Sequence, residues 1–513
     1  MPSTHNAFRQ SLTRGLFEDI AFGRNGFHAV YGGFEPWEDD PLPSNVSLTV
    51  KDQSKIRNGF VFGQRIESSD VSYVVRRIDW DEGSVYEAYD DTWENPQEHD
   101  FYVLTPSFHV FKCLSTGFDP SNPSTINPED QNEVLRPFEV FEASDGYVWK
   151  YLYTLSLAEQ NRFLSSTLMP VKTSLTGRLG GVGSLDEVRV VSAGSGYTVG
   201  ATSVTVVGDG TGASVDFTLD GNGGFESFTI TAFGEGYTWA FLNIVGDGTG
   251  AEAWVRIRGL QEQQTVESVE SNAVPGEVSN IILEDAGEDY TSTPDIIIEG
   301  DGTGATASVV SDVNGILGIT ITNRGQGYTH ATAVITGGGG TGAEARVVLS
   351  PPKGHGSNAV EELFSTVLCV HTGHHRGTQT LELATRQMSL VKGFEDFNTS
   401  KKTDRKTIIA THEMVFEDVS PFSQGDVFTL PNGSEGVVVH VRESSSSVFV
   451  KFHPSVNVQN VSQVEHNGTP RSISKTNNPD VDVRSGDIVY VRNAEPFVET
   501  SMETQTHKIF ITL

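Results

Sequence analysis

Cysteine is scarce in this sequence. The chain has 513 residues but only two cysteines, Cys113 and Cys369, and they are far apart. Two thiols cannot form the dense disulfide framework on which small secreted domains depend. The fold must therefore rest on hydrophobic cores, and a chain of this length generally holds about three domains.

Long apolar runs and a leader segment are also missing. No run of about 18 or more apolar residues occurs, so the sequence predicts no membrane-spanning helix. Residues Met1–Asn6 do not form a basic segment followed by an apolar one, so we expect no signal peptide. Both absences favour a protein that is made and assembled in a cytoplasm.

Positive charge is in deficit. Lysine and arginine number 35 against 67 aspartates and glutamates, which gives a formal net charge of −32. Such a chain repels phosphate groups, so we expect neither a nucleic acid nor a membrane as a partner. A high net charge also keeps free subunits apart until complementary surfaces meet.

Glycine and aromatic residues, in contrast, are plentiful. There are 53 glycines and 29 phenylalanines, and aromatic residues make up 9% of the chain. Disordered chains lack aromatic mass, so this composition predicts a folded protein. Glycine-rich turns between runs of Val, Ile and Thr predict a mainly β fold. One short N-terminal helix is expected over residues 5–21, where Phe8, Leu12, Leu16 and Ile20 form an apolar stripe.

Several segments outside the glycine-rich region read as strands. Residues 147–153 alternate aromatic and other side chains, as a half-buried strand does. Shorter apolar runs predict strands at 71–75, 101–104, 108–114 and 487–491. Residues 359–371 are apolar and fit either a strand or a helix, whereas Gly354–Ser357 reads as a loop.

The middle of the chain repeats itself. The block Gly-Asp-Gly-Thr-Gly-Ala occurs at 208–213, 246–251 and 300–305, and returns with one change at 338–343. A Tyr-Thr dipeptide precedes each block, and the polar stretch Gln261–Gly276 separates two pairs of repeats. A period of this size indicates a repeat architecture, here with three or four short strands per unit. The four units should form two small β modules or one pseudo-symmetric module.

The repeated motif points to turn structure rather than to a ligand site. A dinucleotide fingerprint needs a helix after its glycines, but β-like runs follow here. Calcium binding by Asp209, Asp247 and Asp301 is a weaker alternative, because one copy has Gly339 in place of the aspartate. We assign structural roles in the repeat turns to four tyrosines and four glycines: Tyr197, Tyr237, Tyr290, Tyr328, Gly212, Gly250, Gly304 and Gly342.

No catalytic signature is intact. Asn432–Gly436 resembles the G-x-S-x-G motif except at its first residue and reads better as a hairpin turn. His371, His374 and His375 lack an accompanying acidic or cysteine ligand, and His412-Glu413 lacks the second histidine of a zinc motif. Acidic residues cluster around Trp80 and Trp93, and this cluster fits either a sugar-binding cleft or a solvated acidic face. We therefore expect no enzyme, no catalytic residue, no cofactor and no metal.

Three stretches outside the repeats carry a family resemblance. The first is Phe34–Trp37 followed by acidic residues, and the second pairs Val110–Leu114 with Asp145–Leu152. The third is Arg484–Tyr490 continuing to Gln505-Thr506, and Arg386–Leu390 adds a weaker fourth. In this order they resemble the baseplate wedge subunit of T-even-type contractile-tailed phages, the small dimeric β-sandwich wedge component. The resemblance spans roughly two thirds of the chain.

The resemblance implies an architecture. A β-sandwich wedge fold is split in sequence into residues 1–173 and 353–513 by an inserted β-repeat domain at 174–352. The repeats run over about 184–222, 223–260, 277–315 and 316–350. The aromatic residues that would serve as interface or core anchors are Trp37, Tyr147, Trp149, Tyr151 and Tyr490.

The resemblance also implies a function. The protein would be a structural virion protein of the tail baseplate that joins other wedge proteins, forms a homodimer and transmits the contraction trigger. It would be assembled in the host cytoplasm. The alternative is a tail-associated adhesin or fibre-docking protein that binds host surface glycan through the repeat domain.

Overall fold

A computed structural model of the chain describes residues 6–22, 26–33, 49–131, 139–173, 184–208, 210–237, 240–257, 266, 268–312, 315–373, 385–403, 405–497 and 506–513. The fold is mainly β, as predicted, and the expected N-terminal helix is α1 (Asn6–Phe22). Only part of its apolar stripe is buried: Ile20 is covered and Leu16 is half-buried, whereas Phe8 and Leu12 are exposed. Within these ranges no helix is both long and apolar enough to cross a bilayer.

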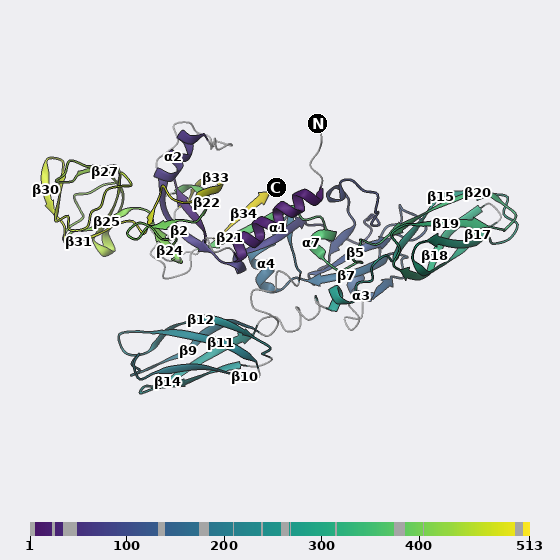
Figure 1. Cartoon of the computed structure of the whole chain (residues 1–513), viewed down its shortest axis with the longest axis horizontal. Helices are drawn as coiled ribbons and strands as arrows, with labels where there is room; N and C mark the ends of the chain where they lie inside the picture. The colour runs from purple at the N-terminus through teal and green to yellow at the C-terminus, as the bar shows by residue number, and fades with distance from the viewer. Residues whose placement is uncertain are drawn as a thin grey trace. The chain divides into compact units, whose positions relative to one another are not determined.

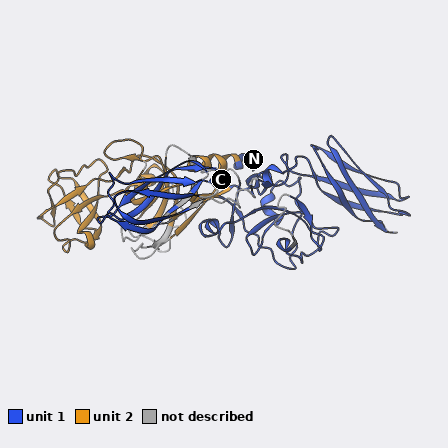
Figure 2. Ribbon diagram, turned by 90° about the horizontal axis from the view of Figure 1, so that it is seen from below, with its two compact units in different colours: residues 1–10, 73–366 blue, residues 11–72, 367–513 orange. Residues whose placement is uncertain are grey.

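The chain divides into two compact units, which Figure 2 shows in different colours. Unit 1 holds residues 1–10 and 73–366, and unit 2 holds residues 11–72 and 367–513. The segments 174–183 and 258–265, which flank the first pair of repeats, lie outside the described residues. The predicted domain boundaries at 173/174 and 352/353 stay a prediction.

An antiparallel sheet rich in aromatic residues forms the core of unit 1. Its strand order is β4 (Tyr102–Leu104), β5 (His109–Ser115), β7 (Val148–Thr154) and β6 (Val140–Glu142). β4, β5 and β7 lie within a residue or two of the predicted strands at 101–104, 108–114 and 147–153, whereas β6 was not predicted. A pair formed by β3 (Val71–Arg76) and β8 (Leu168–Val171) lies in the same region, with the short helices α3 (Pro128–Gln131), α4 (Leu157–Phe163) and α7 (Ala359–Glu362).

The first two repeats form one six-stranded module, in which Figure 1 labels β9, β10, β11, β12 and β14. Its strands are β9 (Leu185–Ser195), β10 (Ser203–Gly208), β11 (Thr211–Leu219), β12 (Phe225–Glu235), β13 (Ala240–Val245) and β14 (Thr249–Ile257). They pair as three antiparallel ribbons, β9 with β14, β10 with β13 and β11 with β12. The first strand of one repeat thus pairs with the last strand of the other.

The last two repeats form a second module with the same pairing. Its ribbons are β15 (Val278–Glu288) with β20 (Thr341–Leu349), β16 (Asp295–Gly300) with β19 (Ala331–Thr336), and β17 (Thr303–Asp312) with β18 (Gly315–Gln326). Each repeat contributes three strands, and every ribbon contains one strand from each repeat. Inward-facing Ile, Val and Ala side chains alternate with exposed polar ones, and the core includes Tyr290 and Tyr328.

Unit 2 contains a five-stranded antiparallel sheet. Its order is β24 (Thr407–Ile409), β2 (Phe60–Ile66), β1 (Phe27–Gly32), β22 (Thr385–Lys392) and β33 (Asp487–Phe497). The helix α2 (Val50–Gly59) precedes β2 and is capped by the Thr49 side chain, which accepts a hydrogen bond from Asp52 N. Two smaller pairs, β21 (Val367–Gly373) with β34 (Thr506–Thr512) and β23 (Glu395–Asp396) with β32 (Val481–Asp482), complete this part.

A seven-stranded antiparallel sheet forms the rest of unit 2. Its order is β30 (Thr469–Ser472), β29 (Gln463–His466), β26 (Val427–Thr429), β27 (Glu435–Arg442), β28 (Ser447–Phe452), β25 (His412–Val415) and β31 (Lys475–Asn477). The sheet encloses a core around Phe416, Phe422 and Phe428. Asn432–Gly436 connects β26 to β27, so the prediction of a hairpin turn there is confirmed.

Candidate functional site

The most unusual group of side chains in unit 1 is a buried polar cluster. Lys112 comes from the middle of β5, His355 and Glu362 from the segment that ends in α7, and Ser279 from β15 of the second repeat module. The four residues are at most 3% exposed. Lys112 Nζ lies 3.1 Å from Glu362 Oε2 and 3.0 Å from His355 Nδ1. His355 Nε2 forms a short hydrogen bond with Ser279 Oγ.

Every charged group of this cluster has partners. Lys112 Nζ also lies 3.9 Å from the centre of the Tyr89 ring, a cation–π contact. Glu362 Oε1 accepts hydrogen bonds from Gly356 N at 2.8 Å and Asn358 N at 3.3 Å. A buried ion pair is tolerated only when its remaining hydrogen-bonding capacity is used in this way.

The protonation states follow from burial and from the neighbours. Burial, with the Lys112 ammonium, lowers the pKa of His355 to about 3, so the ring is neutral near pH 7. Burial would raise the pKa of Glu362, but the charge of Lys112 and the contacts with Lys112 and His355 together outweigh burial and bring that pKa to about 2. Burial lowers the pKa of Lys112, and the Glu362 carboxylate opposes this effect.

Ser279, His355 and Glu362 look like the parts of a hydrolase triad, but the tautomer is wrong. A lysine ammonium only donates hydrogen bonds, so His355 Nδ1 accepts from it. The ring proton then sits on Nε2 and is donated to Ser279 Oγ. A general base would need its lone pair directed at that hydroxyl. The cluster therefore does not activate Ser279.

The cluster joins the second repeat module to the core sheet of unit 1, and two further contacts do the same. Arg346 in β20 forms a two-pronged ion pair with Asp90, at 2.6 and 3.2 Å. Leu349 N donates to Asp91 Oδ2 at 3.0 Å. Two-pronged arginine–carboxylate pairs fix orientation as well as distance. In the first module, the described hydrogen bonds stay among its own residues, for example Ser192 Oγ to Gly250 O.

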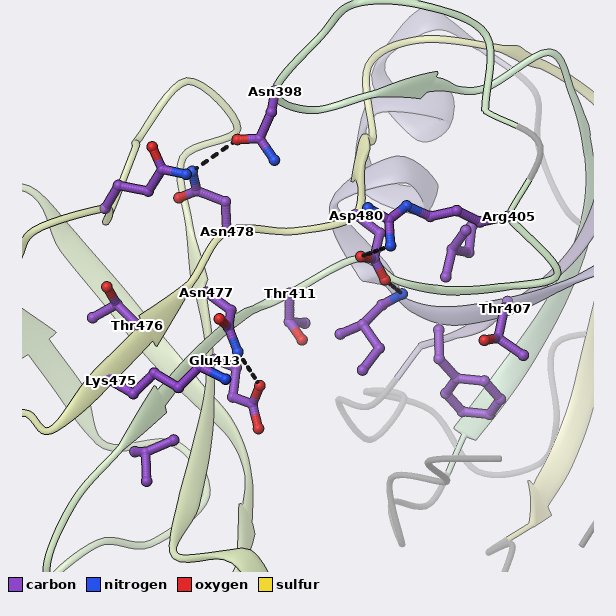
Figure 3. A pocket seen from close by; sticks show the side chains of 16 residues that line it. Asn398, Arg405, Thr407, Thr411, Glu413, Lys475, Thr476, Asn477, Asn478 and Asp480 are labelled. Carbon is purple, nitrogen blue, oxygen red and sulfur yellow. Dashed lines mark hydrogen bonds and ion pairs between the residues drawn. The ribbon is translucent and has the colours of Figure 1, made fainter. Parts of the chain in front are cut away.

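Unit 2 contains a polar cleft of about 700 Å³ between β24 and β31, which are edge strands of the two large sheets. Several of its charged and amide side chains pair with one another, as the dashed lines in Figure 3 show. Arg405 Nη1 lies 3.1 Å from Asp480 Oδ1, and Asn477 Nδ2 donates to Glu413 Oε2 at 2.7 Å. The described side chains of this lining can hydrogen-bond a polar ligand.

The aromatic residues named by the family resemblance lie mainly in the core. Tyr147 and Trp149 are fully buried and stack with ring centres 5.5 Å apart, and Tyr151 is 5% exposed. Tyr490 in β33 is half-buried, and Trp37 lies outside the described residues. Tyr147 Oη donates to Asn122 O and accepts from Tyr86 N. In this chain the buried three are therefore packing residues.

Each repeat tyrosine lies over a glycine of the partner repeat. A Cβ added to Gly248 would be 2.4 Å from Tyr197 Cγ, and one added to Gly302 would be 2.3 Å from Tyr328 Cγ. Gly210 and Gly340 have the same relation to the other two tyrosines, Tyr237 and Tyr290. The next glycines in the motif, Gly212, Gly250, Gly304 and Gly342, have φ between +78° and +85°. The motif therefore combines a tyrosine contact with a left-handed turn.

The motif aspartates bond to threonines rather than standing free for a metal. Asp247 accepts from Thr198 N at 2.9 Å and from Thr198 Oγ1 at 2.7 Å. Asp301 accepts in the same way from Thr329, and these bonds lower its pKa. Asp209 lies outside the described residues. Among the residues that the structure describes, no group of three or more His, Cys, Asp or Glu side chains could hold a metal ion.

Several residues of the other candidate motifs are hydrogen-bonded or stacked within the fold. His412 is buried in β25 and its Nε2 contacts Val456 O at 2.8 Å, while His371 lies in β21 and His374 and His375 fall outside the described ranges. Trp93 stacks on His99 with ring centres 3.9 Å apart. Asp90 and Asp91 of the acidic segment near Trp93 bind the second module.

Sequence reasoning missed the Lys112 cluster. Its one local signal is a lysine inside an apolar strand, between Phe111 and Cys113, where an unpaired charge would be costly. The partner glutamate is 250 residues away, and no pattern links the two positions.

No family model matches this chain, and no curated protein sequence is significantly similar to it.

Proposed function

We propose that this chain is a structural subunit of the baseplate wedge of a contractile phage tail. In this role it joins neighbouring wedge proteins, forms a homodimer and passes the contraction trigger between them. The proposal starts from the resemblance in the segments around Val110–Leu114, Asp145–Leu152 and Arg484–Tyr490.

The observation that carries the proposal is how the second repeat module is attached. Ser279, Arg346 and Leu349 of that module bond to His355, Asp90 and Asp91, and each contact involves a charged or buried group. Several directional bonds at separate points hold a module in one orientation. A subunit that transmits a mechanical signal needs attachments of this kind.

The surroundings of the residues that could take part in catalysis support the same role. The Ser279–His355–Glu362 group is sealed from solvent and has the wrong tautomer for serine activation. Several polar groups of the unit 2 cleft are paired with one another. We propose accordingly that the protein acts through its surfaces rather than as an enzyme.

The test is to locate the protein on tail particles. Gold-labelled antibodies against residues 184–350 should form a ring at the distal end of the tail in electron micrographs. Particles made without this gene are the control. Label at fibre tips would favour the adhesin alternative, in which the repeats bind host glycan. Absence of the protein from purified tails would refute both.

A further inference from the structure

The Lys112 cluster contains the groups needed to join two side chains covalently. An amine and a carboxyl group face each other at 3.1 Å, and His355 Nδ1 lies 3.0 Å from the amine and 3.7 Å from the same carboxyl oxygen. We propose that Lys112 and Glu362 condense in the folded chain to form an isopeptide bond between Lys112 Nζ and Glu362 Cδ.

The reaction balances without any further reagent. Transfer of one proton from the Lys112 ammonium to Glu362 Oε2 gives a neutral amine and a neutral acid. The amine lone pair attacks Cδ, so the N–C bond forms and negative charge develops on Oε1. His355 Nδ1 takes the second proton from the nitrogen and delivers it to Oε2. The Cδ–Oε2 bond then breaks, and one water molecule leaves.

The surrounding atoms are arranged for each of these events. Gly356 N and Asn358 N point at Oε1, at 2.8 and 3.3 Å, and would stabilise the charge that develops there. The bond from His355 Nε2 to Ser279 Oγ keeps the Nδ1 lone pair directed at the amine. His355 is thus the acid–base group of this step, and Ser279 is a positioning residue.

Burial favours the product. The side chains of Lys112 and Glu362 are 0% and 2% exposed, so both charges are held away from water. Condensation replaces two buried charges with one neutral amide, which removes their desolvation cost. Water is also kept from the finished bond, and the fixed approach of the two groups replaces a bimolecular encounter.

The chain contains matched pairs that lack these features. Lys402 Nζ lies at the same 3.1 Å from Glu395 Oε1, but these side chains are 49% and 39% exposed, and no histidine of the described residues forms a hydrogen bond or ion pair with them. Lys451 is half-buried, and among the described residues its Nζ donates to two carbonyl oxygens, Phe60 O and Ala410 O. Neither lysine should form a cross-link.

The first test is the mass of the full-length protein under denaturing conditions. We expect the chain to be lighter than its sequence by one water molecule, and a protease digest to yield one branched peptide that joins Lys112 to Glu362. Peptides with Lys402 and Glu395 should be unmodified and serve as the internal control. An intact mass equal to the sequence mass, with separate Lys112 and Glu362 peptides, would overturn the proposal.

Variants then test the mechanism. Glu362→Gln should still react, now releasing ammonia, so its cross-linked form should have the same mass as the cross-linked wild type. Lys112→Met should show the full sequence mass. His355→Gln should slow the loss of water after refolding at least tenfold. A wild-type mass deficit that persists in Lys112→Met would overturn the assignment to this pair. This outcome is independent of whether the protein is found on tails.

Discussion

The contact between a tyrosine of one repeat and a glycine of the other makes a sharp prediction for Gly248→Ala. The new Cβ would lie 2.4 Å from Tyr197 Cγ and 2.6 Å from Ser195 O. Tyr197 is 7% exposed and packs edge-on against Phe225, so its ring has little room to move. Ser195 O belongs to the backbone and can move even less than the ring.

The expected cost can be worked from these contacts. Overpacking of a well-packed site costs about 1–3 kcal/mol, and two contacts below 3 Å, one of them to backbone, place Gly248→Ala at the upper end. Alanine restricts the unfolded chain more than glycine does, and this stabilises the folded state by about 0.4–1 kcal/mol. The net loss should be about 2 kcal/mol in the opening free energy of residues 185–257, or roughly 30-fold faster amide exchange.

Hydrogen exchange on the full chain measures this directly. Amides of β9 and β14 should exchange faster in Gly248→Ala, while those of the second module stay unchanged because distant sites are independent. Gly221→Ala is the matched control, since its Cβ meets no atom within 4 Å and its φ lies outside the left-handed region. Equal exchange rates in Gly248→Ala and Gly221→Ala would refute the role given to the Tyr197 contact.

Three further predictions concern attachment, pH and the pairing of repeats. Arg346→Met should lower the stability of the β20 ribbon by about 2 kcal/mol in hydrogen exchange, whereas Lys353→Met, at an exposed pair, should change it by less than about 0.5 kcal/mol. Burial lowers the pKa of Lys451 to about 7 in the folded chain. Above that pH the unfolded chain therefore binds more protons than the folded chain does. The free energy of unfolding of unit 2 in urea should therefore rise between about pH 7.5 and 9.5, and Lys451→Met should abolish the rise. Deleting residues 223–257 should unfold residues 185–219 as well, as limited proteolysis would show; persistence of a protected 185–219 fragment would contradict the pairing of strands between repeats.

Much of the fold was predictable from local pattern. A short apolar run placed β5 and alternation placed β7, each to within a residue or two, and Asn432–Gly436 was identified as a turn. Such elements follow from side-chain periodicity and turn chemistry, which act over a few residues. The segment 359–371 could not be assigned to a helix or a strand from its sequence, because it contains the helix α7 followed by the start of the strand β21.

The candidate site was not predictable, because its parts meet only in the folded chain. Lys112 is a charged residue within an apolar strand, and that oddity alone does not name a partner. Gly354–Ser357 was correctly expected to be a loop, yet its histidine lies against Lys112 and Ser279. Nothing in the spacing of these residues indicates contact, since it depends on how β15 packs against β5.

The strand exchange between repeats explains why the motif occurs an even number of times. Each ribbon takes one strand from each repeat, and each tyrosine covers a glycine of its partner. A single repeat would leave three strands with unpaired backbone groups and an uncovered aromatic ring, at a cost that its small core could not offset. The unit of folding is therefore the pair, and variation inside a pair must be compensated within it. Thr291 shows this: where Gly339 replaces the motif aspartate, Thr291 N donates instead to the backbone oxygen of Gly338.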